Sequence, residues 1–369
     1  MATDPSWPSE PAGRYSLSTL LAPAALMRLG IIALVLLGIA SAFARTAGWL
    51  SPGRLDQVRL IDTFEAVNGA HPGFRRNHAK GVCLVGWFDS SGAGARLSGA
   101  AVFAAGRIPV VGRLSIVGPS PEVADGSEAV RSMALDFTLP DGEAWRTSMN
   151  DLPVFPVKDA QGFYEQLVAL KPDPATGKPD PARVEAFLSA HPEAARAIAL
   201  IKGAPSSSGF ANATYNGLNA FRFVDADGKA TPVRWSMRPV DAFEPGPAET
   251  PREKNYLFDA LKARLRQGPA QWHLILVIGQ PGDPTSDATL PWSADHETID
   301  AGTLTVAAIE SEAAGNCRDI EFDPLVLPSG IEPSDDPMLS ARSAAYSVSF
   351  TRRAGETKTP SPVQVGRGR

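Results

Sequence analysis

Short segments in which apolar and polar residues alternate recur between residues 81 and 310 and predict β-strands. In the segment 131–138, Met133, Leu135 and Phe137 alternate with smaller or polar residues, which is typical of an antiparallel strand with one buried face. Segments of this kind are found at 81–88, 97–104, 109–117, 131–138, 219–225, 231–239, 272–279 and 302–310. Four of them lie on each side of a helical stretch. We therefore predict an α+β fold, with a closed, eight-stranded and mostly antiparallel β-barrel and inserted helices.

Apolar residues at helical spacing predict the helices that accompany these strands. They recur every three or four positions in 54–68, 159–201 and 253–267, and a proline-rich connector at 171–181 divides the second of these regions. The last segment, 356–369, is basic and contains proline. We expect it to be disordered.

An apolar stretch near the N-terminus, 29–44, contains no charged residue and has an arginine on each side. Its length is near the lower limit for crossing a bilayer. It suits a retained membrane anchor, a signal peptide cleaved at an Ala-x-Ala site, or a buried core helix. The long polar segment 1–26 before it and Trp49 after it favour a retained single-pass anchor over 27–45. An anchor that keeps the N-terminus in the cytoplasm leaves the bulk of the chain on the periplasmic, extracytoplasmic side.

Composition narrows the class of protein further. A formal net charge of −5, with 20% charged residues, gives no indication of a nucleic-acid partner. Glycine and proline number 33 each, which indicates a chain rich in turns. The two cysteines, Cys83 and Cys317, could form one bridge, but Cys83 lies in an apolar, strand-like run and is more simply interpreted as a core residue.

A first group of polar residues lies at the ends of expected strands and could act on a peroxide. It comprises Arg75, His78, Arg113, Ser115 and the pair Asn150–Asp151. A neutral imidazole can take a proton from a peroxide and return it to the leaving oxygen. This requires a hydroxyl or carbonyl to fix its tautomer and a polar side chain to orient the substrate. Buried arginines would instead bind the carboxylates of a cofactor, although each residue taken alone is more typical of a solvated strand end.

A second group follows near the C-terminus, where Arg342 and Tyr346 are four residues apart and Arg353 lies one to two turns further on. On a helix the first two share a face, so the guanidinium can donate to the phenol oxygen. A cation in that position favours the phenolate, which is a ligand for ferric iron. Without further context, this pattern is more typical of an ordinary amphipathic helix with one buried tyrosine.

Motifs in and around the two groups resemble the catalase superfamily. The sequence RRNHAKG at 75–81 is similar to the segment above the haem, and GIEPS at 330–334 followed by RSAAY at 342–346 is similar to the segment below it. The stretch 184–193 resembles the helix that lays a phenylalanine on the haem, and 219–228 resembles the hairpin beyond it. These matches run in the family's order from about residue 60 to residue 355.

The resemblance implies a haem b domain over 46–355 and assigns a role to each candidate residue. His78 would be the acid–base catalyst, Ser115 would orient it, and Tyr346 would bind the iron. Arg342 would stabilise the phenolate, Arg75, Arg113 and Arg353 would bind the haem propionates, Phe187 would pack on the haem, and Asn150 or Asp151 would orient the peroxide. One position departs from the family, because Asp151 stands where an asparagine is expected, and a carboxylate cannot donate a hydrogen bond unless it is protonated.

The chain ends soon after the proximal motif, so these features together resemble a short, membrane-anchored catalase-related peroxidase. Such an enzyme reduces hydrogen peroxide or organic hydroperoxides, through a ferryl intermediate, with a small organic electron donor. The alternative is a true catalase that disproportionates hydrogen peroxide. Two hypotheses come from other classes of protein: a haem-binding, membrane-tethered barrel without catalysis, and a barrel without haem. The resemblance also allows a homodimer.

Overall fold

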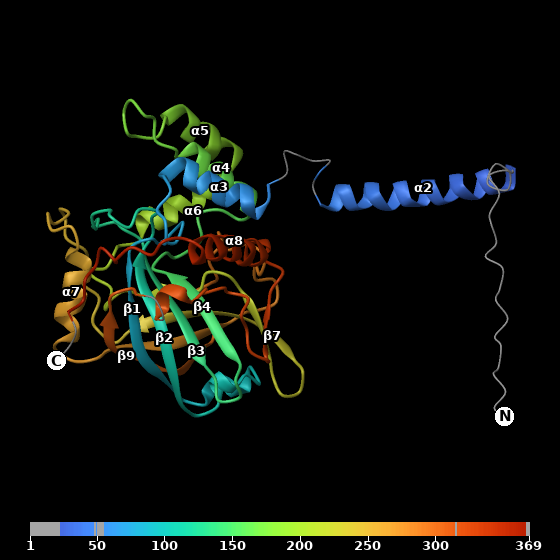
Figure 1. The fold of residues 1–369 in the computed structure, drawn as a ribbon. Helices are drawn as coiled ribbons and strands as arrows, with labels where there is room; N and C mark the ends of the chain where they lie inside the picture. Colours follow the sequence, from blue (N-terminus) through green and yellow to red (C-terminus); the bar gives the residue numbers. More distant parts are fainter. Residues whose placement is uncertain (1–22, 48, 50–54, 314–315, 367–369) are drawn as a thin grey trace, which may run out of the picture. The chain divides into compact units, whose positions relative to one another are not determined.

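The computed structural model describes residues 23–47, 49, 55–313 and 316–366, and it divides into two compact units, Met1–Leu55 and Asp56–Arg369 (Figure 1). In the first unit, α2 (Pro23–Thr46) contains a 21-residue stretch, Leu26–Thr46, that is long and apolar enough to cross a membrane. Its length and composition fit an anchor and a signal sequence equally well. Most of the expected polar segment 1–26 and part of the following linker lie outside the described residues.

The second unit is built on a closed antiparallel β-barrel, as predicted. The eight strands of the barrel follow one another in the order β1, β2, β3, β4, β5, β7, β8, β9, and β9 pairs with β1 to close the ring. Two further short strands, β6 and β10, extend the sheet beyond β7. The bounds are β1 Gly81–Ser90, β2 Gly106–Ile116, β3 Arg131–Thr138, β4 Ala144–Asn150, β5 Tyr215–Asn216, β6 Phe221–Val224, β7 Ala230–Pro239, β8 Ala270–Ile278, β9 Thr298–Glu310 and β10 Ile331–Pro333.

Three details of the strand prediction are wrong. The segment 97–104 is no strand: it follows the 3₁₀ turn η1 (Ala93–Arg96) and contains a second one, η2 (Ala101–Phe103), whose apolar residues pack in the barrel core. The predicted strand 219–225 contains β6, which lies outside the ring. Two strands of the ring were not predicted: β5, which has only two residues, and β4, where only Trp145, Thr147 and Met149 point inward. Because polar residues alternate with these three, the segment shows too little apolar character to be recognised from sequence.

Large aromatic side chains fill the interior of the barrel. The rings of Phe137 and Trp145 stack with centroids 4.9 Å apart, and Trp145 meets Trp235 edge-on at 5.2 Å. All three side chains are buried. A packed interior of this kind leaves the outer face of the barrel wall as the surface on which a large cofactor could lie.

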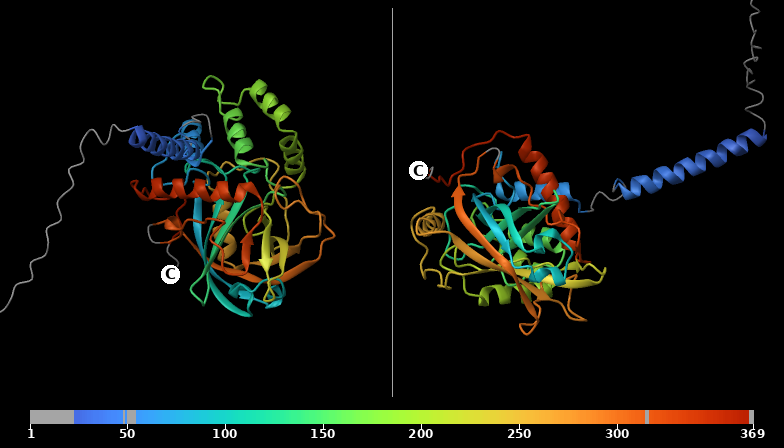
Figure 2. Two further views of the ribbon diagram at one scale, coloured as in Figure 1. Left: turned by 90° about the vertical axis from the view of Figure 1, so that its right-hand side faces the viewer. Right: turned by 90° about the horizontal axis from the view of Figure 1, so that it is seen from below.

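The helices gather mainly at one end of the barrel (Figures 1 and 2). Four of them begin at an aspartate whose carboxylate accepts a backbone N–H of the first turn, which explains why they start where they do. α8 packs against α3 and α4, while α5 packs on α4 and α6. The bounds are α3 Gln57–Asn68, α4 Ala160–Ala169, α5 Pro181–Ala190, α6 Pro192–Gly203, α7 Tyr256–Leu265 and α8 Pro337–Ala354.

The C-terminal segment 356–366 is ordered, contrary to the expectation of disorder. Glu356 forms an ion pair with the buried Arg76, and Lys358 pairs with Asp319. Further along, Val363 is fully buried in the barrel's main core cluster. Composition suggested a solvated tail because it does not reveal that the segment's few apolar residues meet a complementary surface.

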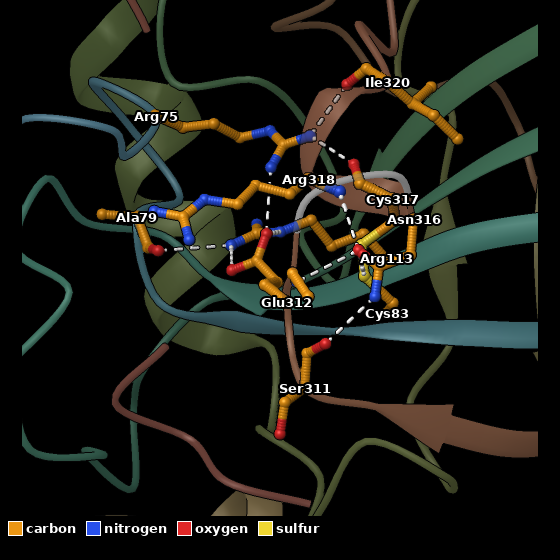
Figure 3. Close-up of a disulfide and its surroundings, with 11 residues drawn as sticks. Arg75, Ala79, Cys83, Arg113, Ser311, Glu312, Asn316, Cys317, Arg318 and Ile320 are labelled. Carbon is orange, nitrogen blue, oxygen red and sulfur yellow. Dashed lines mark hydrogen bonds and ion pairs between the residues drawn. A yellow bond between two sulfur atoms is a disulfide. The ribbon is translucent and has the colours of Figure 1, made fainter. Parts of the chain in front are cut away.

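The two cysteines form a disulfide, so the interpretation of Cys83 as a simple core residue is incomplete. Cys83 is buried in β1, and its sulfur is bonded to that of Cys317 in η3 (Cys317–Asp319), with the Cα atoms 5.4 Å apart (Figure 3). The bond joins positions 234 residues apart in the sequence. It therefore ties the segment that follows β9 to the barrel wall.

Candidate active site

His78 lies in the turn that leads into β1, with a backbone conformation that non-glycine residues rarely adopt (φ 56°). Asn77 holds this turn, because its side-chain oxygen accepts the N–H groups of His78 and Gly118, at 2.9 and 3.1 Å. The N–H of Ala79 donates to the Gly118 carbonyl at 2.9 Å. A strained residue that its neighbours hold in place is a frequent mark of a functional site.

The imidazole of His78 is neutral at physiological pH. Burial, and then the positive charges of Arg113, Arg342 and Arg75, lower the pKa of His78 from 6.5 to about 3. Its Nδ1 is buried and has no hydrogen-bond partner among the described residues. A neutral ring surrounded by guanidinium groups can accept a proton from a bound substrate.

The outer face of the barrel wall beside His78 carries a row of polar residues. The ladder pairs Ser115 on β2 with Ser132 on β3, and Ser132 with Asn150 on β4. Residues paired in this way point to the same face of the sheet. The interior residues Leu114, Met133 and Met149 fix that face as the outer one, so Ser115 and Asn150 share it.

The hydrogen bonds of Ser115, Asn150 and Asp151 bear on the roles predicted for these three residues. No hydrogen bond joins Ser115 to His78 in the described structure, so its role in orienting the ring stays a prediction. The carboxylate of Asp151 accepts the N–H of Arg131 at 2.9 Å and faces its guanidinium at 3.3 Å. Asp151 is therefore engaged by Arg131, and Asn150 is the member of the pair that lies on the polar row, where its Oδ1 accepts the Ser132 hydroxyl.

A cluster of buried arginines adjoins this row. Arg113 on β2 forms a two-point ion pair with Glu312, at 2.7 and 3.0 Å, and Arg75 reaches the same carboxylate at 3.1 Å (Figure 3). Gly81 on β1 makes room for this arrangement, because a Cβ there would lie 2.6 Å from the Arg113 guanidinium. The third arginine, Arg353 on α8, is 3% exposed, and within the described part of the chain its guanidinium has no hydrogen bond or ion pair.

Burial dominates the electrostatics of this cluster. The pKa of Arg75 is lowered by burial and then by the charges of Arg113 and Arg353. Burial and Arg113 also lower the pKa of Arg353, to about 10. Positive charges that lie this close destabilise one another, so an anion between them is stabilised. A carboxylate of a cofactor could be that anion.

Tyr346 and Arg342 form the second group on α8, as the i, i+4 spacing predicted. The Arg342 guanidinium lies 3.4 Å from the Tyr346 hydroxyl and donates to the Asn219 side chain at 2.5 Å and to the Ser148 carbonyl of β4 at 3.4 Å. α8 therefore presents the pair towards the same wall of the barrel that carries Asn150.

The two groups also influence each other electrostatically. Arg342, the neighbour of Tyr346, contributes to the lowering of the His78 pKa, and Tyr346 in turn acts on the pKa of Arg75, which burial lowers overall. Residues 268 positions apart in sequence (His78 and Tyr346) are thus linked through Arg342 and Arg75.

Phe187 is the predicted residue that the structure associates least with this region. It is buried on α5 in a small cluster with Val157, Ala169 and Ala194, and its ring lies 4.7 Å from that of His191. The contact of Phe187 with a haem stays a prediction. Glu312 was not recognised from sequence, because a carboxylate after a strand has no signature until its two arginine partners are known.

These residues fit a haem. Arg353 offers an unpaired buried cation for a carboxylate, Tyr346 offers an oxygen beside a guanidinium, and the buried His78 Nδ1 lacks a partner. Among the described residues, no group of three or more histidines, cysteines, aspartates or glutamates could hold a bare metal ion.

Comparison with known proteins agrees with this geometry. The Catalase family model matches residues 40–366. A catalase-related peroxidase of Synechococcus elongatus is 36% identical over 324 residues, covering 85% of this chain and 93% of the relative. A second one, of Mycolicibacterium paratuberculosis, is 34% identical over 308 residues, covering 82% and 96%.

Solved catalases share the fold. A fungal catalase superposes with a TM-score of 0.68 at 20% identity over 82% of this chain, and catalase A of Saccharomyces cerevisiae gives the same values. The match covers 64% and 66% of those two chains, so this chain spans about two thirds of their length. With its closed barrel, its two residue groups and a family match over most of its length, this chain belongs to the catalase family of haem enzymes.

Proposed function

We propose that this protein is a haem b peroxidase that reduces hydrogen peroxide or organic hydroperoxides with a small external organic donor. The observation that carries the proposal is the strained His78, whose pKa is lowered by burial and by nearby arginines, among them Arg342, the neighbour of Tyr346 on α8. The similarity to proteins named catalase-related peroxidases over more than nine tenths of their length supports it.

In this proposal the protein's own residues hold the cofactor and move one proton. Tyr346 would bind the iron, with Arg342 stabilising the negative charge of the phenolate, and Arg353, Arg75 and Arg113 would bind the carboxylates. A bound haem would supply the two electrons that break the O–O bond. His78 accepts the hydroperoxide proton at its free ring nitrogen and returns it to the leaving oxygen, so that water or an alcohol departs.

A true catalase is the second candidate, and the position of Asn150 favours it. The expected obstacle to catalase turnover was a carboxylate in place of an asparagine. Yet Asp151 is engaged by Arg131, and Asn150 lies on the polar row with an amide that can donate a hydrogen bond to a peroxide.

Oxygen evolution separates the two candidates. The purified protein, loaded with haem, is given hydrogen peroxide with and without a phenolic donor, and oxygen and oxidised donor are both measured. The proposal predicts donor oxidation with little oxygen release, whereas rapid oxygen release without a donor would show a true catalase. Haem uptake without either reaction would indicate the non-catalytic binding protein, and loss of donor oxidation in His78→Ala is the matching test of the site.

The helix α2 and the disulfide support a proposal for the location of the enzyme. We propose that α2 anchors the protein in a membrane and that the catalytic unit lies on the extracytoplasmic side. A disulfide between two buried cysteines supports this, because such bonds persist mainly in oxidising compartments.

Light scattering of the detergent-solubilised protein would test the homodimer that the resemblance allows.

A further inference from the structure

Glu312 is a buried carboxylate for which the proposed reaction has no role so far. It follows β9, its side chain is 3% exposed, and it accepts hydrogen bonds from Arg113 at 2.7 and 3.0 Å and from Arg75 at 3.1 Å. Burial opposes its charge, but the positive charges of Arg113 and Arg75 outweigh that effect and lower the pKa of Glu312. It is therefore a fixed negative charge among arginines.

The surroundings of Glu312 are rigid on both sides. Arg75 donates to the carbonyls of Cys317 and Ile320, at 3.0 and 2.8 Å, and Arg113 donates to the carbonyl of Ala79 at 3.3 Å (Figure 3). The disulfide to Cys83 holds Cys317, and Cys83 is the ladder partner of Arg113 on β1. Both arginines are thus hydrogen-bonded to, or part of, segments that the Cys83–Cys317 disulfide joins covalently.

Glu312 is the carboxylate that both Arg75 and Arg113 contact directly. Two other positive charges act in the same region. The charge of Arg113 acts on Arg353, and the charge of Arg318 acts on Glu312, although the donors of Arg318 are used by the carbonyls of Gly73 and Thr359. One carboxylate shared by two arginines leaves each of them able to contact a further anion.

We propose that Glu312 is the fixed counter-ion that positions Arg75 and Arg113 towards the carboxylates of a bound cofactor. The inference rests on the proposed function, since it takes haem as that cofactor. It makes Glu312 a positioning residue, which acts on the cofactor only through the two arginines. Removing the charge of Glu312 should weaken binding of the cofactor and also change the electrostatic potential at the iron.

The test compares Glu312→Gln and Glu312→Asp with wild type in the full-length, haem-loaded protein. Glu312→Gln keeps the shape and removes the charge, so the reduction potential should become more positive and haem release to excess apomyoglobin about 10- to 100-fold faster. Glu312→Asp keeps the charge but cannot reach both arginines, so its potential should stay near that of wild type while release is faster. Asp241→Asn is the matched control, because Asp241 forms the same two-point pair with Arg264 at 2.6 and 2.9 Å outside the cluster. It should change neither quantity.

The outcomes separate this inference from the proposed function. A wild type that takes up no haem overturns both. A wild type that takes up haem, with a reduction potential that Glu312→Gln leaves unchanged, overturns the counter-ion role alone, even if that variant is less stable to heat. If Glu312→Gln does not fold, Glu312→Asp decides, since an unchanged rate of haem release in that variant contradicts the positioning of both arginines by Glu312.

Discussion

The disulfide between Cys83 and Cys317 should be a major contributor to the stability of the barrel, and its removal can be predicted in some detail. The two residues are 234 positions apart, so the bond closes a loop that contains most of the catalytic unit. In the chain-entropy model, closing a loop of that size stabilises the folded state by about 5 kcal/mol, and native disulfides contribute about 2–5 kcal/mol in practice. Each kcal/mol shifts the melting temperature of a domain this large by about 2–4 °C. We therefore expect Cys83→Ser/Cys317→Ser to melt on the order of 10 °C below wild type.

The assay is thermal unfolding of the full-length protein in detergent, followed by tryptophan fluorescence. Wild type is measured with and without a phosphine reductant, and the double serine variant is measured in the same two conditions. Reduced wild type should melt like the double variant, and the variant itself should not respond to the reductant. The reasoning would be refuted if alkylation and mass spectrometry show both thiols of wild type reduced while its melting temperature stays unchanged.

Four further predictions concern single features of the site and the anchor. Because the pKa of His78 is lowered to about 3, kcat/KM should show no limb from this residue between pH 5 and 8; an acid limb near pH 6.5 that disappears in His78→Gln would contradict the neutral, desolvated imidazole. The unfolded chain regains the usual pKa of 6.5, so His78 binds a proton more readily when unfolded, and the apoprotein should lose stability as the pH falls from about 6.5 to about 3; urea unfolding across this range checks the sign. Gly81→Ala places a Cβ 2.6 Å from the Arg113 guanidinium, and we expect it to cost about 1–3 kcal/mol in unfolding free energy and to accelerate haem release. The exposed Gly203, where a Cβ would meet no atom within 4 Å, is the control, and Gly203→Ala should leave haem release unchanged. Deleting residues 1–55 should move the protein from the carbonate-washed membrane fraction to the soluble fraction; a full-length protein that is already soluble, or a mature chain that lacks the segment, would contradict a retained anchor.

The barrel and most of its strands could be predicted because inward residues such as Met133, Leu135 and Phe137 alternate with others along a strand. The same reasoning failed for β4, where the outward residues are strongly polar, and for 97–104, where apolar residues fill a 3₁₀ turn. Alternation reports burial on one face, but it cannot distinguish a strand from an apolar loop that closes the end of a barrel. The ordered C-terminal segment was missed for a related reason, since a few buried residues such as Val363 are enough to hold a polar chain.

The candidate site was predictable where a motif fixes local geometry and unpredictable where the geometry comes from partners distant in sequence. The spacing of Arg342 and Tyr346 predicts their contact because both lie on one helix. Glu312, by contrast, becomes meaningful only once Arg75 and Arg113 converge on it from other elements. The choice between Asn150 and Asp151 likewise depends on strand register, which determines the face each side chain takes.

The central claim is that His78 and Tyr346 stand on opposite sides of one haem, and an absorption spectrum tests it most directly. Purified wild type, Tyr346→Phe and His78→Ala are loaded with haem and recorded before and after one equivalent of peroxide. The account predicts a ferric phenolate-type spectrum for wild type that changes at once with peroxide, a different resting spectrum for Tyr346→Phe, and a normal resting spectrum with a greatly slowed peroxide response for His78→Ala. A resting spectrum that Tyr346→Phe leaves unaltered, or a peroxide response of undiminished rate in His78→Ala, would contradict it.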